Sequence, residues 1–97
     1  MTETNFTPGP WFVNGHMTKY VEARIGGGII QEVAAVGPTD ADGGYGSQQE
    51  ANARLIASAP ELYEALDKAM HCKYFVLLSG AVQHEVSAAL AKARGDS

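Results

Sequence analysis

One stretch of the chain, Glu50–Leu66, constrains the fold most because its apolar residues recur at the spacing of an α-helix. The steps of three and four residues place them on one face of a helix. The pattern keeps its phase across Pro60, so the proline predicts a bend or a new start within one helical unit. We expect this face to form the core, with Leu55, Leu62, Leu66 and Met70 buried.

Local signals predict where the helices begin and end. Ser47 and Ser58 are each followed three residues later by glutamate, which makes two capping boxes at helix starts. The apolar stripe continues into Tyr74–Leu78, which is interpreted as continuing helix, with a short buried strand as the alternative. Ser79-Gly80 breaks this helix, and apolar residues between Val82 and Ala93 then define a last helix.

Glycine-rich turns divide the first third of the chain into three predicted strands. Asn14-Gly15 is a strong hairpin signal because both residues tolerate a positive φ. Gly26-Gly27-Gly28 makes the next reversal, and Gly37-Pro38 closes the last strand. The expected strands are Trp11–Val13, His16–Arg24 and Ile29–Val36.

The predicted fold class is α+β, with a small three-stranded antiparallel meander followed by two or three C-terminal helices. A length of 97 residues suits one domain with a modest core. We expect residues 1–97 to form this single domain. Residues 1–9 are predicted to be flexible, 10–37 to form the meander, 38–46 a loop and 47–94 the helical part.

The charge and the single cysteine limit the classes of function. A net charge of −4 disfavours nucleic-acid binding, which depends on Lys and Arg neutralising phosphates. Cys72 cannot form an internal disulfide and is predicted to be a buried helix residue in a cytosolic protein. No secretory leader is recognisable, and the longest apolar run, Tyr74–Leu78, is far shorter than a membrane span, so no membrane association is expected.

Signatures of catalysis and of cofactor binding are not recognisable. The histidines, His16, His71 and His84, lie on different predicted elements without metal-ligand spacing. The glycine loop Gly43–Gly46 matches no phosphate-binding motif, and capping explains the serines at predicted helix starts. We therefore expect no enzyme activity, no metal and no cofactor.

Five residues are candidates for binding a ligand, because they supply stacking, charge or hydrogen bonds. Trp11 is either a core residue or a stacking platform, and Arg54 is either a ligand contact or the partner of Glu50 on the next turn. Asn52 occupies neither the apolar stripe nor a cap. The predicted ligand-binding residues are Trp11, Arg24, Tyr45, Asn52 and Arg54.

The C-terminal helix is rich in alanine, which allows helices to approach closely. A chain of this size with so many small core residues completes its core by self-association in many cases. We expect a homodimer or a larger homo-oligomer that forms through the C-terminal helices.

Two segments carry a resemblance to a known group of proteins. The opening Thr7-Pro-Gly-Pro-Trp11 and the segment Glu50–Leu66, which contains Ala-Asn-Ala-Arg-Leu-Ile-Ala-Ser-Ala-Pro-Glu-Leu, resemble a family of small phage and prophage proteins. That family combines a TPGPW opening with an ANARLIAxAPELxEAL-like helical segment. The resemblance covers about half of the chain and implies a phage origin, an accessory role outside the virion and a location in the host cytoplasm.

Two functions follow as expectations from this phage setting. A small antiparallel sheet followed by helices resembles phage sponge proteins, such as the Thoeris anti-defence proteins, which sequester cyclic-nucleotide or cyclic ADP-ribose immune signals. This resemblance implies counter-defence by binding a nucleotide-like signal without turnover. The alternative is an anti-CRISPR-type inhibitor that occludes a host defence protein by surface contact.

Overall fold

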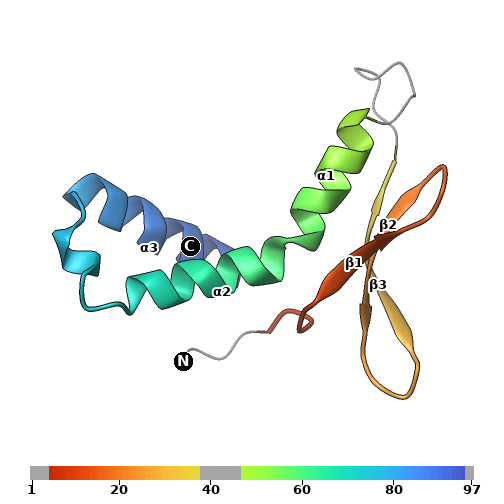
Figure 1. Cartoon of the computed structure of the whole chain (residues 1–97), viewed down its shortest axis with the longest axis horizontal. Helices are drawn as coiled ribbons and strands as arrows, with labels where there is room; N and C mark the ends of the chain where they lie inside the picture. Colours follow the sequence, from red (N-terminus) through yellow and green to blue (C-terminus); the bar gives the residue numbers. More distant parts are fainter. Residues whose placement is uncertain (1–4, 38–46, 96–97) are drawn as a thin grey trace. The chain divides into compact units, whose positions relative to one another are not determined.

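The chain has the predicted α+β architecture. The computed structural model describes residues 5–37 and 47–95, and in this part three antiparallel strands precede three α-helices (Figure 1). The chain divides into two compact units, which are described separately. The sheet unit is Thr7–Pro60, and the helical unit combines Met1–Phe6 with Glu61–Ser97.

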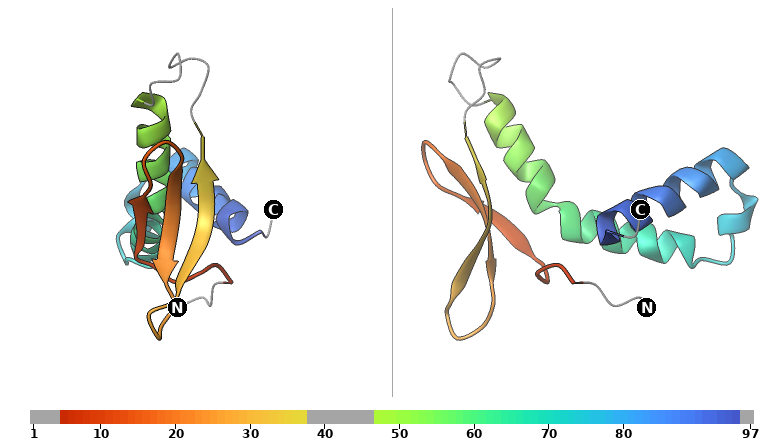
Figure 2. Two further views of the ribbon diagram at one scale, coloured as in Figure 1. Left: turned by 90° about the vertical axis from the view of Figure 1, so that its right-hand side faces the viewer. Right: turned by 180° about the vertical axis from the view of Figure 1, so that it is seen from behind.

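The sheet is a meander of β1 (Trp11–Asn14), β2 (Lys19–Arg24) and β3 (Ile30–Val36), in that order (Figure 2). The register pairs Trp11 with Ala23 on β1 and β2. A β-bulge interrupts the pairing of β2 with β3, because Val21 pairs with Ala34 whereas Glu22 pairs with Glu32. One residue, Val33, is therefore extra on β3, as expected for a bulge in an antiparallel pair.

The first hairpin differs from its prediction in the length of its loop. The second strand begins at Lys19 instead of His16, so residues 15–18 connect the strands. Gly15 has a φ of +106°, and its N–H donates a hydrogen bond of 2.9 Å to the Asn14 side-chain oxygen. The Asn-Gly pair thus makes the reversal as predicted, within a loop longer than a two-residue turn.

Replacing Gly15 with alanine is expected to destabilise the sheet unit by about 1–3 kcal/mol. A Cβ at this position would lie 2.2 Å from the Thr18 carbonyl oxygen, and the positive φ disfavours any side chain. Gly37→Ala is the matched control, because its Cβ would meet no atom within 4 Å. Thermal unfolding followed by Trp11 fluorescence measures both variants, and equal midpoints would contradict the prediction.

The second reversal is formed by Gly26, Gly27 and Gly28, as the sequence predicts. All three have positive φ values, of 98°, 59° and 78°. The flanking backbone closes the turn, because Ile25 N–H donates to the Ile29 carbonyl at 3.1 Å and Ile29 N–H donates to the Gly26 carbonyl at 3.0 Å. Only glycine adopts three such conformations in succession at little cost.

Helix α1 (Ser47–Ala57) covers one face of the sheet, and the core of the sheet unit lies between them (Figure 1). Ala53 and Ala57 of the helix are buried against Val21. Partly buried residues that complete the cluster are Trp11, Val13, Val33, Ala34, Val36 and Ile56. The prediction that Leu55 is buried is wrong, since it is 64% exposed. The face of α1 that carries Ala53 and Ala57 meets the sheet, because small side chains let a helix approach a sheet closely.

Gln49 joins the start of α1 to the first hairpin loop and to the end of β3, a role that the sequence did not indicate. Its side chain is buried, and its Nε2 group donates to the Met17 carbonyl at 2.8 Å and to the Val36 carbonyl at 2.7 Å. One amide thus binds two backbone carbonyls, which anchors α1 to the first hairpin loop and to the end of β3.

A break at Ser58 separates α1 from α2 (Ala59–Met70), at the predicted position of the bend. The Ser58 hydroxyl donates to the Arg54 carbonyl at 2.9 Å, so it bonds to the end of α1, whereas the expected capping box has it accept from the start of α2. Pro60 is fully buried in the first turn of α2, where a missing N–H costs nothing. The side chain of Ser47, at the other expected capping box, lies outside the described residues.

The helical unit departs from the predicted continuous helix. After α2 the chain turns at residues 71–74 and forms a single 3₁₀ turn, η2 (Phe75–Leu77), before α3 (Gly80–Arg94). The prediction of helix or strand at Tyr74–Leu78 is therefore wrong. Cys72, predicted to be buried in a helix, is exposed in this turn. Ser79 caps α3 as predicted, since its hydroxyl accepts from Val82 N–H at 3.2 Å.

The core of the helical unit uses a different face of α2 from the one predicted. Tyr63 and Asp67 are buried on α2 and Leu90 is buried on α3. Leu62 and Leu66, the predicted core, are exposed, and Met70 is partly buried. The face that packs is rotated by about 100°, one residue, from the leucine stripe. Phe6 and Arg94, both distant in sequence, contact Tyr63 on this face, which no periodicity within α2 could show.

The start of the chain also contributes to this core. The ring of Phe6 lies edge-on to the ring of Tyr63, with centroids 5.2 Å apart and planes at 79°. The Tyr63 hydroxyl accepts a hydrogen bond of 3.3 Å from Arg94 Nη1 on α3. Phe6, in the segment predicted to be flexible, is therefore a packed residue of the helical unit.

Candidate functional site

Trp11, the candidate stacking residue, lies in the core of the sheet unit. It packs against the cluster of Val21, Ala53 and Ala57, and its indole N–H donates to the Thr7 carbonyl at 3.0 Å. A half-buried tryptophan whose polar edge is bonded is typical of a structural residue. The Thr7-Pro-Gly-Pro-Trp11 opening is thus a local structure in which the backbone of Thr7 binds the tryptophan.

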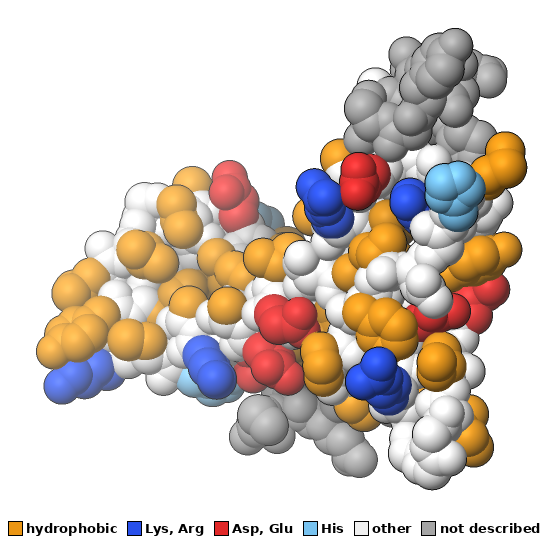
Figure 3. Space-filling model, turned by 45° about the vertical axis from the view of Figure 1, so that its right-hand side comes forward, with side chains coloured by type: hydrophobic (Ala, Val, Ile, Leu, Met, Phe, Trp, Pro, Cys, Tyr) orange, Lys and Arg blue, Asp and Glu red, His pale blue; other side chains and the backbone are white. Residues whose placement is uncertain are grey.

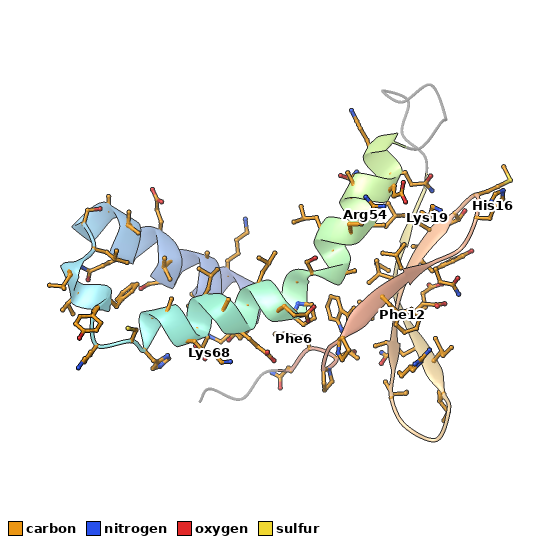
Figure 4. All side chains as sticks on the ribbon, in the orientation of Figure 1. Phe6, Phe12, His16, Lys19, Arg54 and Lys68 are labelled. Atoms are coloured by element: carbon orange, nitrogen blue, oxygen red, sulfur yellow. The ribbon has the colours of Figure 1, made fainter. Side chains whose placement is uncertain are left out.

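Arg24, at the end of β2, lies on the sheet face opposite α1. Side chains alternate along a strand, so Phe12 points away from the helix that covers Trp11. The Arg24 guanidinium lies 5.3 Å from the centroid of the Phe12 ring, a cation–π contact on this open face. Phe12 is labelled in Figure 4. Asn14 donates a hydrogen bond of 3.3 Å to Glu22 on the same face.

Asn52 and Arg54 lie on α1, on the other side of the sheet. They flank Ala53, which faces the sheet, so the two side chains leave opposite flanks of the helix. The Arg54 side chain is 72% exposed (Figure 4). It forms an ion pair of 3.0 Å with Glu50, as predicted by the alternative in which Arg54 is the partner of Glu50. Asn52 is exposed to solvent.

The sheet unit therefore does not bring the candidate residues together. Arg24 is separated from Arg54 by the thickness of the sheet, and Trp11 lies between the sheet and α1. Tyr45, together with the glycine loop Gly43–Gly46, lies outside the described residues. A ligand site built from these five residues stays a prediction, and within one chain the four that are described do not converge.

The exposed apolar residues at the turn between α2 and α3 are a feature that the sequence analysis missed. Tyr74, Val76, Leu77 and Leu78, here called the apolar tip, are all exposed, Val76 by 71% and Leu77 by 77%. Figure 3 shows hydrophobic side chains crowding this end of the helical unit. The signal was present as the longest apolar run of the chain, but its phase matched the helical stripe of α2 and it was interpreted as core.

The described residues show one buried carboxylate. Asp67 is buried, and its Oδ1 atom accepts no hydrogen bond from the part of the chain that the structure describes. His71 lies on the next turn, with its Nδ1 atom 3.6 Å from that oxygen and 2.7 Å from the Asp67 backbone carbonyl oxygen. Within residues 5–37 and 47–95, no three His, Cys, Asp or Glu side chains gather as metal ligands.

No helix in the described parts of the chain combines the length and the apolar character that crossing a membrane requires. No curated protein and no solved structure is significantly similar to the chain. A family model described as Salmonella phage P22 protein Y8K6 matches residues 1–97, which confirms the expectation of a small phage protein family. The chain belongs to the family of Salmonella phage P22 protein Y8K6.

Proposed function

We propose that this phage protein is a counter-defence factor that acts in the host cytoplasm by binding a host defence protein, without catalysis. The observation that carries the proposal is the apolar tip, Tyr74 and Val76–Leu78, which one turn of 3₁₀ helix presents to solvent. Membership of a phage family supports the setting, and the tip supports the mode of action.

The apolar tip has the chemistry of a protein-binding surface. It combines a tyrosine with three aliphatic side chains, and the core of an interface is depleted in charge and enriched in aromatic residues. Contiguous exposed apolar groups of this kind mark interaction sites on small proteins. The neighbouring Lys73, whose ammonium lies 5.0 Å from the Tyr74 ring centroid, supplies a polar rim.

Sequestration of a cyclic-nucleotide or cyclic ADP-ribose signal is the other form of counter-defence. A small-molecule site requires polar and aromatic groups that converge. Arg24 and Arg54 lie on opposite sides of the sheet, so one chain offers at most one of them to a compact anion. This separation makes occlusion of a protein the better supported form.

The experiment removes the tip and leaves the fold intact. The double variant Val76→Ser, Leu77→Ser changes two side chains that contribute little to the core, so its melting temperature is expected to stay within about 2 °C of wild type. Leu55→Ser is the matched control, since Leu55 is an exposed aliphatic residue of the sheet unit. The assay is the plating efficiency of a phage that lacks the gene on a defended host expressing each variant.

We expect the double variant to give a plating efficiency at least about tenfold lower than the wild-type protein, because central apolar anchors dominate binding energy. Leu55→Ser is expected to give the wild-type plating efficiency. Retained protection by the double variant would contradict the proposed surface. Titration calorimetry of the wild-type protein with cyclic dinucleotides and cyclic ADP-ribose isomers distinguishes the alternative. If the wild-type protein binds one of these signals and the double variant still protects the phage, sequestration of the signal is the function instead.

A further inference from the structure

The apolar tip is built on a hydrogen-bonded backbone in the turn between α2 and α3 (Figure 1). The Leu77 N–H donates to the Tyr74 carbonyl at 3.0 Å, and the Leu78 N–H donates to the Phe75 carbonyl at 3.1 Å. The Phe75 N–H donates in turn to the Cys72 carbonyl at 3.0 Å. Each of these bonds spans three residues, as in a 3₁₀ helix. Three N–H groups of the turn are therefore paired within the turn itself.

Two carbonyl groups of the same turn are bound by one side chain of α3. The Nε2 group of Gln83 donates to the Leu78 carbonyl at 2.8 Å and to the Val76 carbonyl at 3.3 Å. A side-chain amide carries two N–H donors, so it can supply one to each carbonyl. Gln83 therefore joins the start of α3 to both ends of the 3₁₀ turn's exposed apolar segment.

The cap of α3 fixes the position from which Gln83 reaches the tip. The Gln83 N–H donates to the Ser79 carbonyl at 3.0 Å, and the Ser79 hydroxyl accepts from the Val82 N–H at 3.2 Å. A serine cap of this kind stabilises the first turn of a helix. Ser79 follows the tip directly in the chain, so the tip, the cap and the Gln83 amide are bonded to one another as one local structure.

This local structure keeps four apolar side chains in contact with water. All members of the apolar tip are exposed. Removal of apolar surface from water is favourable, so a free backbone would let these side chains turn toward the helices. The hydrogen bonds of the turn oppose that rearrangement. They hold the side chains in one arrangement, which suits a surface that binds a partner.

We propose that Gln83 is a positioning residue, which holds the apolar tip in the conformation that binds the host protein. The inference rests on the proposed function, because the tip is the surface on which that function depends. Gln83 acts through the carbonyls of Val76 and Leu78 and needs no contact with the partner. An ordered loop loses less conformational entropy on binding than a mobile one, so removal of the Gln83 donors weakens binding.

Two substitutions remove the donors with opposite side effects. Gln83→Glu keeps the shape of the side chain and adds a negative charge, whereas Gln83→Met keeps its approximate volume and adds an apolar group. His84→Met is the matched control on the same helix, because His84 is exposed and its side chain bonds to no group within residues 5–37 and 47–95. Backbone nitrogen relaxation by NMR measures the order of residues 76–78 in the whole chain, and the plating assay measures protection.

We expect the order parameters of residues 76–78 to fall from about 0.85 to below about 0.6 in both Gln83 variants. Their plating efficiency is expected to be at least about tenfold below wild type, with a melting temperature within about 2 °C of wild type. His84→Met is expected to match wild type in all three measurements. Unchanged order in either Gln83 variant overturns the proposal, because the effect then comes from the added charge or the added apolar group. A melting temperature lowered by more than about 5 °C in both variants overturns it too, because Gln83 then stabilises the whole unit.

Failure of this proposal is distinguishable from failure of the proposed function. Protection by the double variant Val76→Ser, Leu77→Ser contradicts the proposed function. Protection by the Gln83 variants, when the double variant has lost it, overturns the role of Gln83 alone. The order parameters require no partner, so they test the hydrogen bonds of Gln83 in either case.

Discussion

Replacement of Leu90 with alanine is expected to lower the free energy of unfolding of the helical unit by about 2–5 kcal/mol. Leu90 is 1% exposed and is the largest fully buried side chain of the described residues. Removing three carbon atoms leaves a cavity that so small a core cannot refill. Urea unfolding followed by circular dichroism at 222 nm gives the change, because two of the three long helices belong mainly to this unit.

Leu77→Ala is the control for this prediction. It removes the same atoms from a leucine of the same unit that is 77% exposed, so a change below about 0.5 kcal/mol is expected. The difference between the two variants isolates burial from side-chain chemistry and from helix propensity. Equal effects would show that Leu90 is not a core residue, and would contradict the assignment of the buried face of α3.

Replacement of Gln49 with methionine is expected to cost the sheet unit about 1–3 kcal/mol. The side chain keeps its approximate volume but loses the Nε2 donor, which leaves the Met17 and Val36 carbonyls without that partner. A hydrogen bond contributes about 0.5–1.5 kcal/mol to stability, and two partly buried ones are lost here. Trp11 lies in the core of the same unit, so its fluorescence during urea unfolding measures the change.

Asn52→Met on the same helix is the matched control, since Asn52 is exposed and its side chain bonds to no group within residues 5–37 and 47–95. We expect its effect to stay below about 0.5 kcal/mol. Native-state hydrogen exchange adds a second measure. The amides of α1 should exchange faster in Gln49→Met than in the control, because α1 loses its anchor to the first hairpin loop and to β3.

The two units offer different surfaces for function. The sheet unit presents an open sheet face with Arg24 stacked on Phe12, while its other face is covered by α1. The helical unit presents the apolar tip, on groups that the sequence would place in a core.

Local sequence determined the elements of the sheet unit. Gly15 and the three glycines at 26–28 make the reversals with positive φ values, which few other residues adopt at low cost. Ser79 determined the start of α3 through a hydrogen bond within one turn. The break at Ser58 and Pro60 was predictable for the same reason, since proline cannot continue the preceding helix.

Candidate binding residues were chosen by chemistry, and their placement needed the structure. A tryptophan, two arginines and an asparagine are suitable groups for a ligand, but their distances depend on how α1 lies on the sheet. That packing turned Ala53 inward, which sent Asn52 and Arg54 to opposite flanks and left Arg24 on the other face. The bonds of Gln49 to Met17 and Val36, which lie 32 and 13 residues away, were likewise beyond local reasoning.

Sequence by itself determined that α2 is an amphipathic helix, whereas only the tertiary structure decided which of its sides is buried. The apolar stripe through Leu62 and Leu66 was real, but Tyr63 and Asp67 are the buried residues, and Arg94 of α3 bonds to Tyr63. Periodicity defines a face relative to its own helix, and adjacent faces differ by a rotation of only about 100°. The choice between them belongs to the partner helix, because a helix is buried where the facing side chains leave room for it.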